Sequence, residues 1–317
     1  MNEASIFDPR HIQRAFSRSA NSYDAAAQLQ HEVEGWMLES LDYFSLEGTR
    51  AGADRPAEAR TPQAVLDLGC GTGRAARAMQ ARWPKAQVLA LDLALPMLRT
   101  HPQPQGLVSG MLARLRTRSP MRVCADARAL PLAEHSVDLV FSNLCVQWID
   151  DLPALFAGLR RVLRPGGLLL VSSFGPDTLH ELRSAFAEAD AAPHVSPFAS
   201  MAQFGDALVA AGFRDPVLDR DILRTHYPDL PALMRELRDI GATNALTSRR
   251  RSLTGRARFA AAESAYAAWR EADGRLPATW EIVTAMAWAP EHGVPIREGG
   301  HEVARFPASA IPVRRRS

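Results

Sequence analysis

One stretch of nine residues constrains the fold of this sequence more than any other. Residues 65–68 (Val-Leu-Asp-Leu) form a short apolar run, and glycines follow at positions 69, 71 and 73. Glycines let a backbone turn tightly and approach a ligand closely. Where such a loop leads into a helix, the first N–H groups of the helix can bind that ligand. The segment therefore predicts a strand, a ligand-binding loop and a helix in succession.

The middle of the chain alternates between short apolar runs and helical patterns. We expect strands at 65–68, 87–92, 122–126, 137–142 and 168–173, and helices at 73–83, 95–100 and 152–163. Short buried strands separated by helices are typical of a parallel sheet covered on both faces. With further strands at 215–224 and 280–288, the prediction is an α/β fold: a doubly wound, mostly parallel seven-stranded sheet of the Rossmann-like kind.

The expected elements divide the chain into five segments. Residues 8–46 show a broken helical stripe that begins at Asp8 and Pro9, a good N-cap and first helical residue. Residues 101–120, rich in Pro, Gly and Arg, are expected to form a surface loop. The segments are an N-terminal helical segment and linker at 1–62, a ligand-binding core at 63–227, a helical cap insertion at 228–277, the last core strand at 278–290 and a tail at 291–317.

Composition narrows the class of protein. The formal net charge of +2 gives no overall attraction to nucleic acid or to a membrane. Cys70, Cys124 and Cys145 lack metal-ligand spacing, and free thiols favour a reducing compartment. The N-terminus has no apolar signal core, and no apolar run approaches the ~18 residues that span a bilayer. We therefore expect a cytoplasmic protein without a metal.

Polar residues stand at the ends of three consecutive expected strands. Asp92 ends the second strand, Asp126 ends the third, and Asn143 follows the fourth. Ligands of open α/β sheets bind at the carboxyl ends of the strands. Asp92 can accept hydrogen bonds from ribose hydroxyls, Asp126 from an adenine amino group, and Asn143 can line the crevice. The alternative is that the two aspartates cap the turns that follow them.

The glycine spacing separates two kinds of cofactor. Dinucleotide sites use G-x-G-x-x-G, whereas this loop reads G-x-G-x-G, and Arg74 follows the third glycine. That spacing is typical of sites for S-adenosyl-L-methionine (SAM). An NAD enzyme is the alternative within this fold, because Asp92 suits it. The third glycine is misplaced for NAD, however, and no acid–base pair for hydride transfer is evident.

These motifs resemble those of class I SAM-dependent methyltransferases at 65–73, 92, 126 and 163–167. Three further segments resemble the malonyl-acyl carrier protein O-methyltransferases of early biotin synthesis. They are 15–24 (AFSRSANSYD), 174–183 (FGPDTLHELR), and 240–246 (IGATNAL) together with 253–256 (LTGR). The likeness runs from about residue 8 to about residue 290. It implies SAM as methyl donor, S-adenosyl-L-homocysteine (SAH) as product, and a malonyl thioester on acyl carrier protein as substrate.

The resemblance leaves two other readings open. One is methylation of another small acid or of a quinone precursor. The other is a non-methylating protein on the same fold, because a mitochondrial arginine hydroxylase that assists respiratory complex I assembly shares much of the pattern. Fold alone does not decide between these functions.

The chemistry fits a carboxylate acceptor. A carboxylic acid with a pKa of roughly 4 is ionised at neutral pH, so its methylation needs no general base, and the sequence offers no convincing base. Tyr23 is the candidate for orienting the substrate. The expected cofactor-binding residues are Arg18, Asp67, Gly69, Cys70, Gly71, Gly73, Asp92, Leu93, Asp126, Ala127 and Asn143. The expected substrate residues are Gln147, Trp148, Phe174, Gly175 and Asn244.

A row of arginines in the expected cap suggests a protein partner. Arg249, Arg250, Arg251, Arg256 and Arg258 span ten residues without an acidic residue between them. Carrier proteins are strongly acidic, so such a patch would steer docking. A basic stretch can also bind nucleic acid, but the near-neutral chain with no recognised binding module does not favour that partner. A solvated loop is the remaining alternative.

Overall fold

The computed structural model describes residues 5–46, 61–101, 118–252 and 254–291, together with two short strands at 296–298 and 301–303. Most of residues 47–62, which form the linker part of the expected N-terminal segment, lies outside the described residues, as does most of the expected loop at 101–120 and of the tail at 291–317. In the described part of the chain, no helix is long and apolar enough to cross a membrane.

The predicted seven-stranded sheet is confirmed, with strand order β3-β2-β1-β4-β5-β7-β6. Strands β1 to β5 are parallel, and β7 is antiparallel to both of its neighbours. Strand β6 therefore runs in the same direction as β1 to β5. The strands are β1 (Ala64–Leu68), β2 (Gln87–Asp92), β3 (Met121–Cys124), β4 (Val137–Ser142), β5 (Leu163–Phe174), β6 (Arg214–Tyr227) and β7 (Leu276–Trp288), with a separate pair β8 (Ile296–Glu298) and β9 (His301–Val303).

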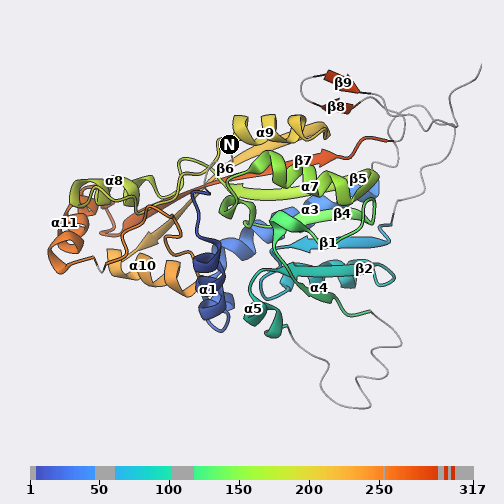
Figure 1. The fold of residues 1–317 in the computed structure, drawn as a ribbon. Coiled ribbons are helices and arrows are strands. Elements are labelled where there is room, and N and C mark those ends of the chain that lie inside the picture. The colour runs from blue at the N-terminus through green and yellow to red at the C-terminus, as the bar shows by residue number, and fades with distance from the viewer. Residues whose placement is uncertain are drawn as a thin grey trace, which may run out of the picture.

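Helices cover both faces of the sheet (Figure 1). Residues such as Phe141 and Leu139 pack with Met79 of α4 on one face, whereas Leu66 packs with Phe156 of α7 on the other. The helices are α1 (Pro9–Ser19), α2 (Tyr23–Ala26), α3 (Gln28–Leu46), α4 (Arg74–Arg82), α5 (Leu95–Arg99), α7 (Leu152–Val162), α8 (His180–Ala189), α9 (Met201–Ala210), α10 (Leu230–Asp239) and α11 (Arg256–Tyr266). Single 3₁₀ turns occur at Ala127–Ala129, Val146–Trp148 and Ala267–Trp269.

Helix starts follow the local capping chemistry. The Asp8 side chain accepts a hydrogen bond from the His11 backbone N–H at 3.1 Å, and Pro9 begins α1. This start was predicted from the sequence. Ser200 and Gln203 form a capping box at the start of α9. Such caps satisfy backbone donors that have no partner within the helix.

Three strands extend by several residues beyond the ranges that the sequence predicted: β6 continues to Tyr227, and β5 and β7 begin earlier than expected. The expected turn at 164–167 belongs to β5, because Leu163 pairs with Val137 and Gly167 bonds to Ala289. Gly166 takes a left-handed φ of 69° within this irregular start of the strand. Strand β7 begins at Leu276, inside the range expected for the cap insertion. Alternation of apolar residues did not mark these ends, since pairing with a neighbouring strand defines them.

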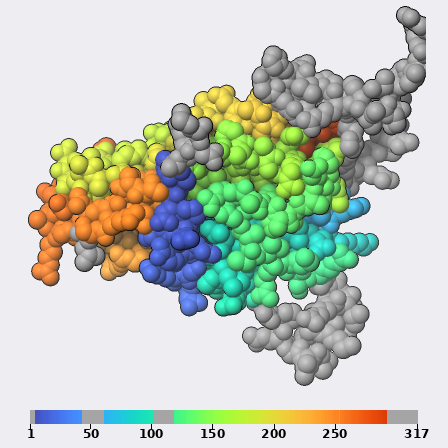
Figure 2. Space-filling view, viewed as in Figure 1, coloured from blue at the N-terminus to red at the C-terminus, as the bar shows by residue number. Residues whose placement is uncertain are grey.

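Helices α10 and α11 lie between β6 and β7 in the chain. Because β6 is parallel to β1–β5, its carboxyl end lies at the same sheet edge as theirs. These helices gather with α8 at one end of the molecule (Figure 1). The N-terminal segment (blue) lies between them and the core (Figure 2). It is held there by bonds such as Ser22 Oγ to Asp239 O at 2.8 Å and Asp8 N to Ala245 O at 2.8 Å.

Candidate active site

The glycine loop after β1 has the geometry that the sequence predicted. Gly69, Gly71 and Gly73 have φ values of 71°, 52° and 75°, which L-residues rarely adopt. Packing also demands glycine. A Cβ at Gly69 would overlap the Cys145 side chain, and one at Gly73 would overlap the His101 ring. The Gly69 N–H donates to Leu91 O at 2.8 Å, which joins the loop to β2.

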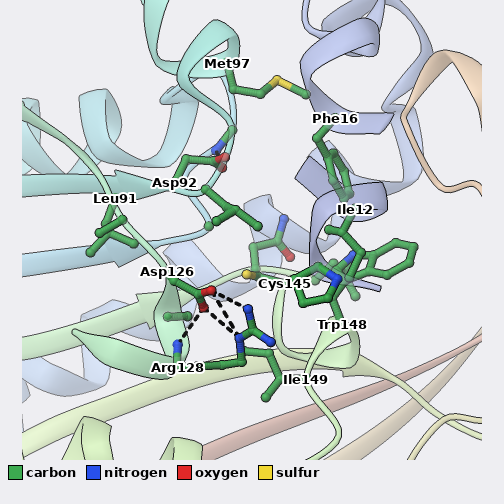
Figure 3. Close-up of a pocket in the computed structure, with 18 of the residues that line it drawn as sticks. Ile12, Phe16, Leu91, Asp92, Met97, Asp126, Arg128, Cys145, Trp148 and Ile149 are labelled. Carbon is green, nitrogen blue, oxygen red and sulfur yellow. Dashed lines mark hydrogen bonds and ion pairs between the residues drawn. The ribbon is translucent and has the colours of Figure 1, made fainter. Parts of the chain in front are cut away.

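A cavity opens at the carboxyl ends of β1, β2 and β4 and is covered by the N-terminal segment (Figure 3). We call it the cofactor cavity. Asp92, at the end of β2, accepts hydrogen bonds from the backbone N–H groups of Gly71 and Ala94 at 2.9 and 2.7 Å. Burial raises the pKa of the Asp92 carboxyl despite these bonds. Each carboxylate oxygen keeps a second lone pair. Asp92 can therefore accept hydroxyl groups of a ligand while it holds the loop.

Asp67 is the most unusual polar group of the site. Its side chain is 2% exposed, and Oδ2 has no hydrogen-bond partner among the described residues. Burial raises the pKa of this carboxyl well above its usual value. Asp67 lines a small polar cavity with Tyr23, Glu34 and Gly71. An unsatisfied buried carboxylate is costly, and a cationic group bound beside the glycine loop would remove that cost.

The environment of Asp126 differs from the one expected for an adenine acceptor. Its side chain caps the turn at Ala127–Ala129 by accepting the Arg128 N–H at 2.9 Å. It also binds the Arg128 guanidinium, with Nε 3.0 Å from Oδ1 (Figure 3). These bonds lower the pKa of the Asp126 carboxyl. Asp126 lines the cavity as expected, but it also has the capping role that was the alternative reading.

Tyr23 lies where the cofactor cavity meets the small polar cavity. The Cε1 atom of its ring is 3.9 Å from the position that a Cβ would take at Gly71. Burial, followed by the negative charges of Asp92 and Glu34, raises the pKa of the Tyr23 hydroxyl. The hydroxyl is therefore a hydrogen-bond donor, and not a base, at neutral pH.

The remaining cofactor candidates differ in where they lie. Leu93 and Ala127 line the cofactor cavity, Cys70 lines the small polar cavity, and Asn143 lines both. The Asn143 amide is bonded at both ends, to Gln30 O and to Ser172 Oγ, each at 2.9 Å. Arg18, by contrast, lines neither cavity. It lines a basic cleft together with Arg14, Arg238, Arg249, Arg250 and Arg251. Its position on α1 was predictable, but the direction of its side chain was not.

A largely apolar cavity, here called the apolar cavity, adjoins the cofactor cavity. It is lined by Gln147, Trp148, Phe174 and Asn244, four of the five expected substrate residues. Trp148 also lines the cofactor cavity, where it packs edge-on against Phe16 at 5.5 Å. Gly175 lies outside this cavity. It is buried against Glu281, whose side chain would overlap a Cβ at that position.

The arginine row does not form a single exposed patch. The Arg249 guanidinium pairs with Asp8 at 3.0 Å, and Arg250 pairs with the buried Asp190 at 2.6 Å. These two ion pairs hold residues 249–250 against the start of α1 and against the end of α8. Arg251, Arg256 and Arg258 are exposed, although only Arg251 faces the basic cleft.

Sequence reasoning missed several residues of the cavities. Ile12 and Phe16 are one turn apart on α1, a spacing that marks one face of a helix, so this signal was available. Arg128, His194 and Arg238 carried no comparable signal because packing of distant elements places them. The missed residues include Phe7, Pro9, Ile12, Phe16, Met97, Arg128, Cys145, Ile149, Phe186, His194, Met234, Arg238 and Trp280.

The strand order, the glycine loop and the cavity at the strand ends define the class I methyltransferase fold. Residues 66–171 match the methyltransferase domain family. The solved YcgJ protein of Bacillus subtilis aligns with 82% of this chain and 99% of its own, with 15% identity and a TM-score of 0.51.

Relatives that match nearly the whole chain identify the family more specifically than the fold does. The chain is 56% identical to a malonyl-[acyl-carrier protein] O-methyltransferase of Xylella fastidiosa, with 98% of each chain covered. It is 46% identical to the Laribacter hongkongensis protein of the same name, with 92% of each covered. The chain therefore belongs to the malonyl-[acyl-carrier protein] O-methyltransferase family, as the sequence resemblance predicted.

Proposed function

We propose that this protein transfers the methyl group of SAM to the free carboxylate of a malonyl thioester carried by acyl carrier protein. The relative from Xylella fastidiosa carries the proposal, because the match covers 98% of the chain. The match therefore includes α1, the cap helices and the apolar cavity, and not only the common methyltransferase core. The ester would enter synthesis of the pimeloyl part of biotin.

The polar groups of the cofactor cavity and of the adjoining small polar cavity fit SAM. The buried, unpartnered oxygen of Asp67 suits the ammonium of the methionine part, and Asp92 suits the ribose hydroxyls. The apolar side chains of Leu93, Ala127 and Ile149 can cover the adenine. SAM, when bound, supplies an electrophilic methyl on a positively charged sulfur.

The protein's own residues need only align and desolvate the acceptor. A carboxylate is already ionised at neutral pH, so no proton has to be removed. The Tyr23 hydroxyl, which stays protonated, can donate a hydrogen bond to one oxygen and leave the other to attack. Trp148 lies between the cofactor cavity and the apolar cavity and limits access of water to the carboxylate. Such alignment and exclusion of water are the main sources of rate for a weak nucleophile.

Carrier-protein docking remains part of the proposal, but it now rests on three of the five expected arginines. Arg251, Arg256 and Arg258 are the exposed members of the row, and exposed charges steer an acidic partner. Arg249 and Arg250 are bound by aspartates, so their removal would disturb the cap as well as the surface charge.

Mass spectrometry of malonyl-acyl carrier protein incubated with the enzyme and SAM tests the proposal. The expected result is the mass of one added methyl group, reversed by an esterase. Asp92→Asn should abolish the product and weaken SAH binding, whereas Asp221→Asn on the exposed edge strand β6 should change neither. Methylation of other acids but not of the malonyl thioester would refute the proposed substrate. SAH binding without transfer to any acid would favour a non-methylating role.

A further inference from the structure

We propose that the thioester arm of the carrier-bound substrate enters through the basic cleft, passes His194 and Arg238, and ends at Trp148, with Arg238 binding the phosphate of the arm. This inference rests on the proposed function, because it concerns how that substrate reaches the cofactor. It assigns a binding path and a specificity residue that the reaction itself does not require.

The path follows from residues shared between cavities. The basic cleft and the apolar cavity have four lining residues in common, which form their junction: His194, Arg238, Thr243 and Asn244. The apolar cavity and the cofactor cavity share Trp148. A chain that is threaded from the cleft through the junction would therefore present its tip beside the cofactor.

The apolar cavity suits a flexible chain that carries amides. Its walls include Phe174, Phe186, Met234 and Trp280. Gln147 adds a polar group to these walls. Its buried Oε1 has no hydrogen-bond partner among the described residues, while its Nε2 donates to Leu144 O at 2.7 Å. An unpaired buried acceptor costs stability. An amide N–H of the arm would satisfy it.

The cleft carries excess positive charge. Exposed arginines 14, 18, 238 and 251 line it, and no described carboxylate forms an ion pair with any of them. Two aspartates also line the cleft: Asp239, and Asp8, which pairs with Arg249. Of these four arginines, only Arg238 also lines the apolar cavity. A phosphate at the cleft end of the arm would meet this guanidinium, which can form two parallel hydrogen bonds with it.

The junction itself is held in place. His194 stacks on Phe186 at 4.0 Å between ring centroids, and its Nε2 lies 3.3 Å from Asp190. Arg250 binds the same aspartate. The Asn244 amide donates to Pro193 O at 2.7 Å. Arg238 is thus an exposed cation beside a fixed rim, a position suited to selection of the substrate.

Steady-state kinetics with two substrates tests the role of Arg238. One substrate is malonyl-acyl carrier protein, and the other is malonyl-N-acetylcysteamine, a thioester without a phosphate. Arg238→Gln should raise KM for the carrier substrate about tenfold, as expected for one lost charge-assisted contact, with little change in kcat. KM for the short thioester should not change. Arg235→Gln, on the same helix but outside both cavities, is the matched control and should affect neither substrate.

A second variant tests the path. Met234→Trp should fill the apolar cavity and lower transfer to both thioesters at least tenfold, while SAH affinity measured by calorimetry stays within twofold. Equal effects of Arg238→Gln on the two substrates, or full activity of Met234→Trp, would refute the path alone. Failure of the unsubstituted enzyme to methylate either thioester would instead refute the proposed function, and the path with it.

Discussion

Replacing Gly73 by alanine tests whether the cofactor loop depends on the histidine beneath it. Gly73 has a φ of 75°, and an L-residue in this region costs about 1–2 kcal/mol. A Cβ there would lie 2.5 Å from Nδ1 of His101 and closer to Cε1 and Nε2. The ring is 7% exposed and has little room to move. Its displacement would break the contact between Nε2 and Gly71 O at 3.2 Å, worth about 1 kcal/mol.

We therefore expect Gly73→Ala to lower the free energy of unfolding by about 2–3 kcal/mol. Urea unfolding, followed by circular dichroism and extrapolated linearly to water, measures this change. Calorimetric titration with SAH should show weaker binding because Gly71 belongs to the same loop. Gly158→Ala in α7 is the control, since a Cβ there meets nothing within 4 Å and alanine favours a helix by about 1 kcal/mol.

The double variant Gly73→Ala/His101→Ala separates the two causes. Without the imidazole the steric part of the cost disappears, whereas the backbone strain remains. The double variant should therefore be more stable than the sum of the two single effects predicts, by about 1 kcal/mol. Strict additivity of the two single changes would show that the ring does not require glycine at position 73.

Three further results are expected. Asp67→Asn should raise the unfolding free energy of the ligand-free protein at neutral pH but weaken SAH binding. The folded-state pKa of Asp67 lies well above 3.8, so ionisation penalises the folded state increasingly as pH rises from near 4 toward that raised pKa. The gain from Asp67→Asn should consequently shrink as pH is lowered toward 4, and a gain independent of pH would contradict this reasoning. Arg250→Gln should lower the melting temperature because the buried Asp190 loses its arginine partner, whereas Arg251→Gln should leave it unchanged and only raise KM for the carrier protein. Calorimetric scans and carrier-substrate kinetics check this pair, and equal melting temperatures would contradict the structural role of Arg250.

Local sequence patterns predicted much of the fold. The ranges 87–92 and 137–142 agree with β2 and β4 at both ends, because each is a run dominated by apolar residues bounded by turn residues. Asp8 and Pro9 begin α1 as expected, since capping depends on neighbouring residues alone. The glycine loop was also readable, because its backbone geometry requires glycine at fixed spacing.

The assembled structure alone decided which residues meet. Phe16 packs on Trp148, Asp8 pairs with Arg249, and His101 fills the space beneath Gly73. Periodicity tells which face of an element is apolar, but not which distant element will cover it. The order of the strands and the parallel direction of β6 bring the cap to the ligand edge of the sheet. For that reason the sequence determined the elements, the glycine loop and the family, whereas the long-range packing of those elements decided that Arg18 faces the basic cleft and that Gly175 lies outside the substrate cavity.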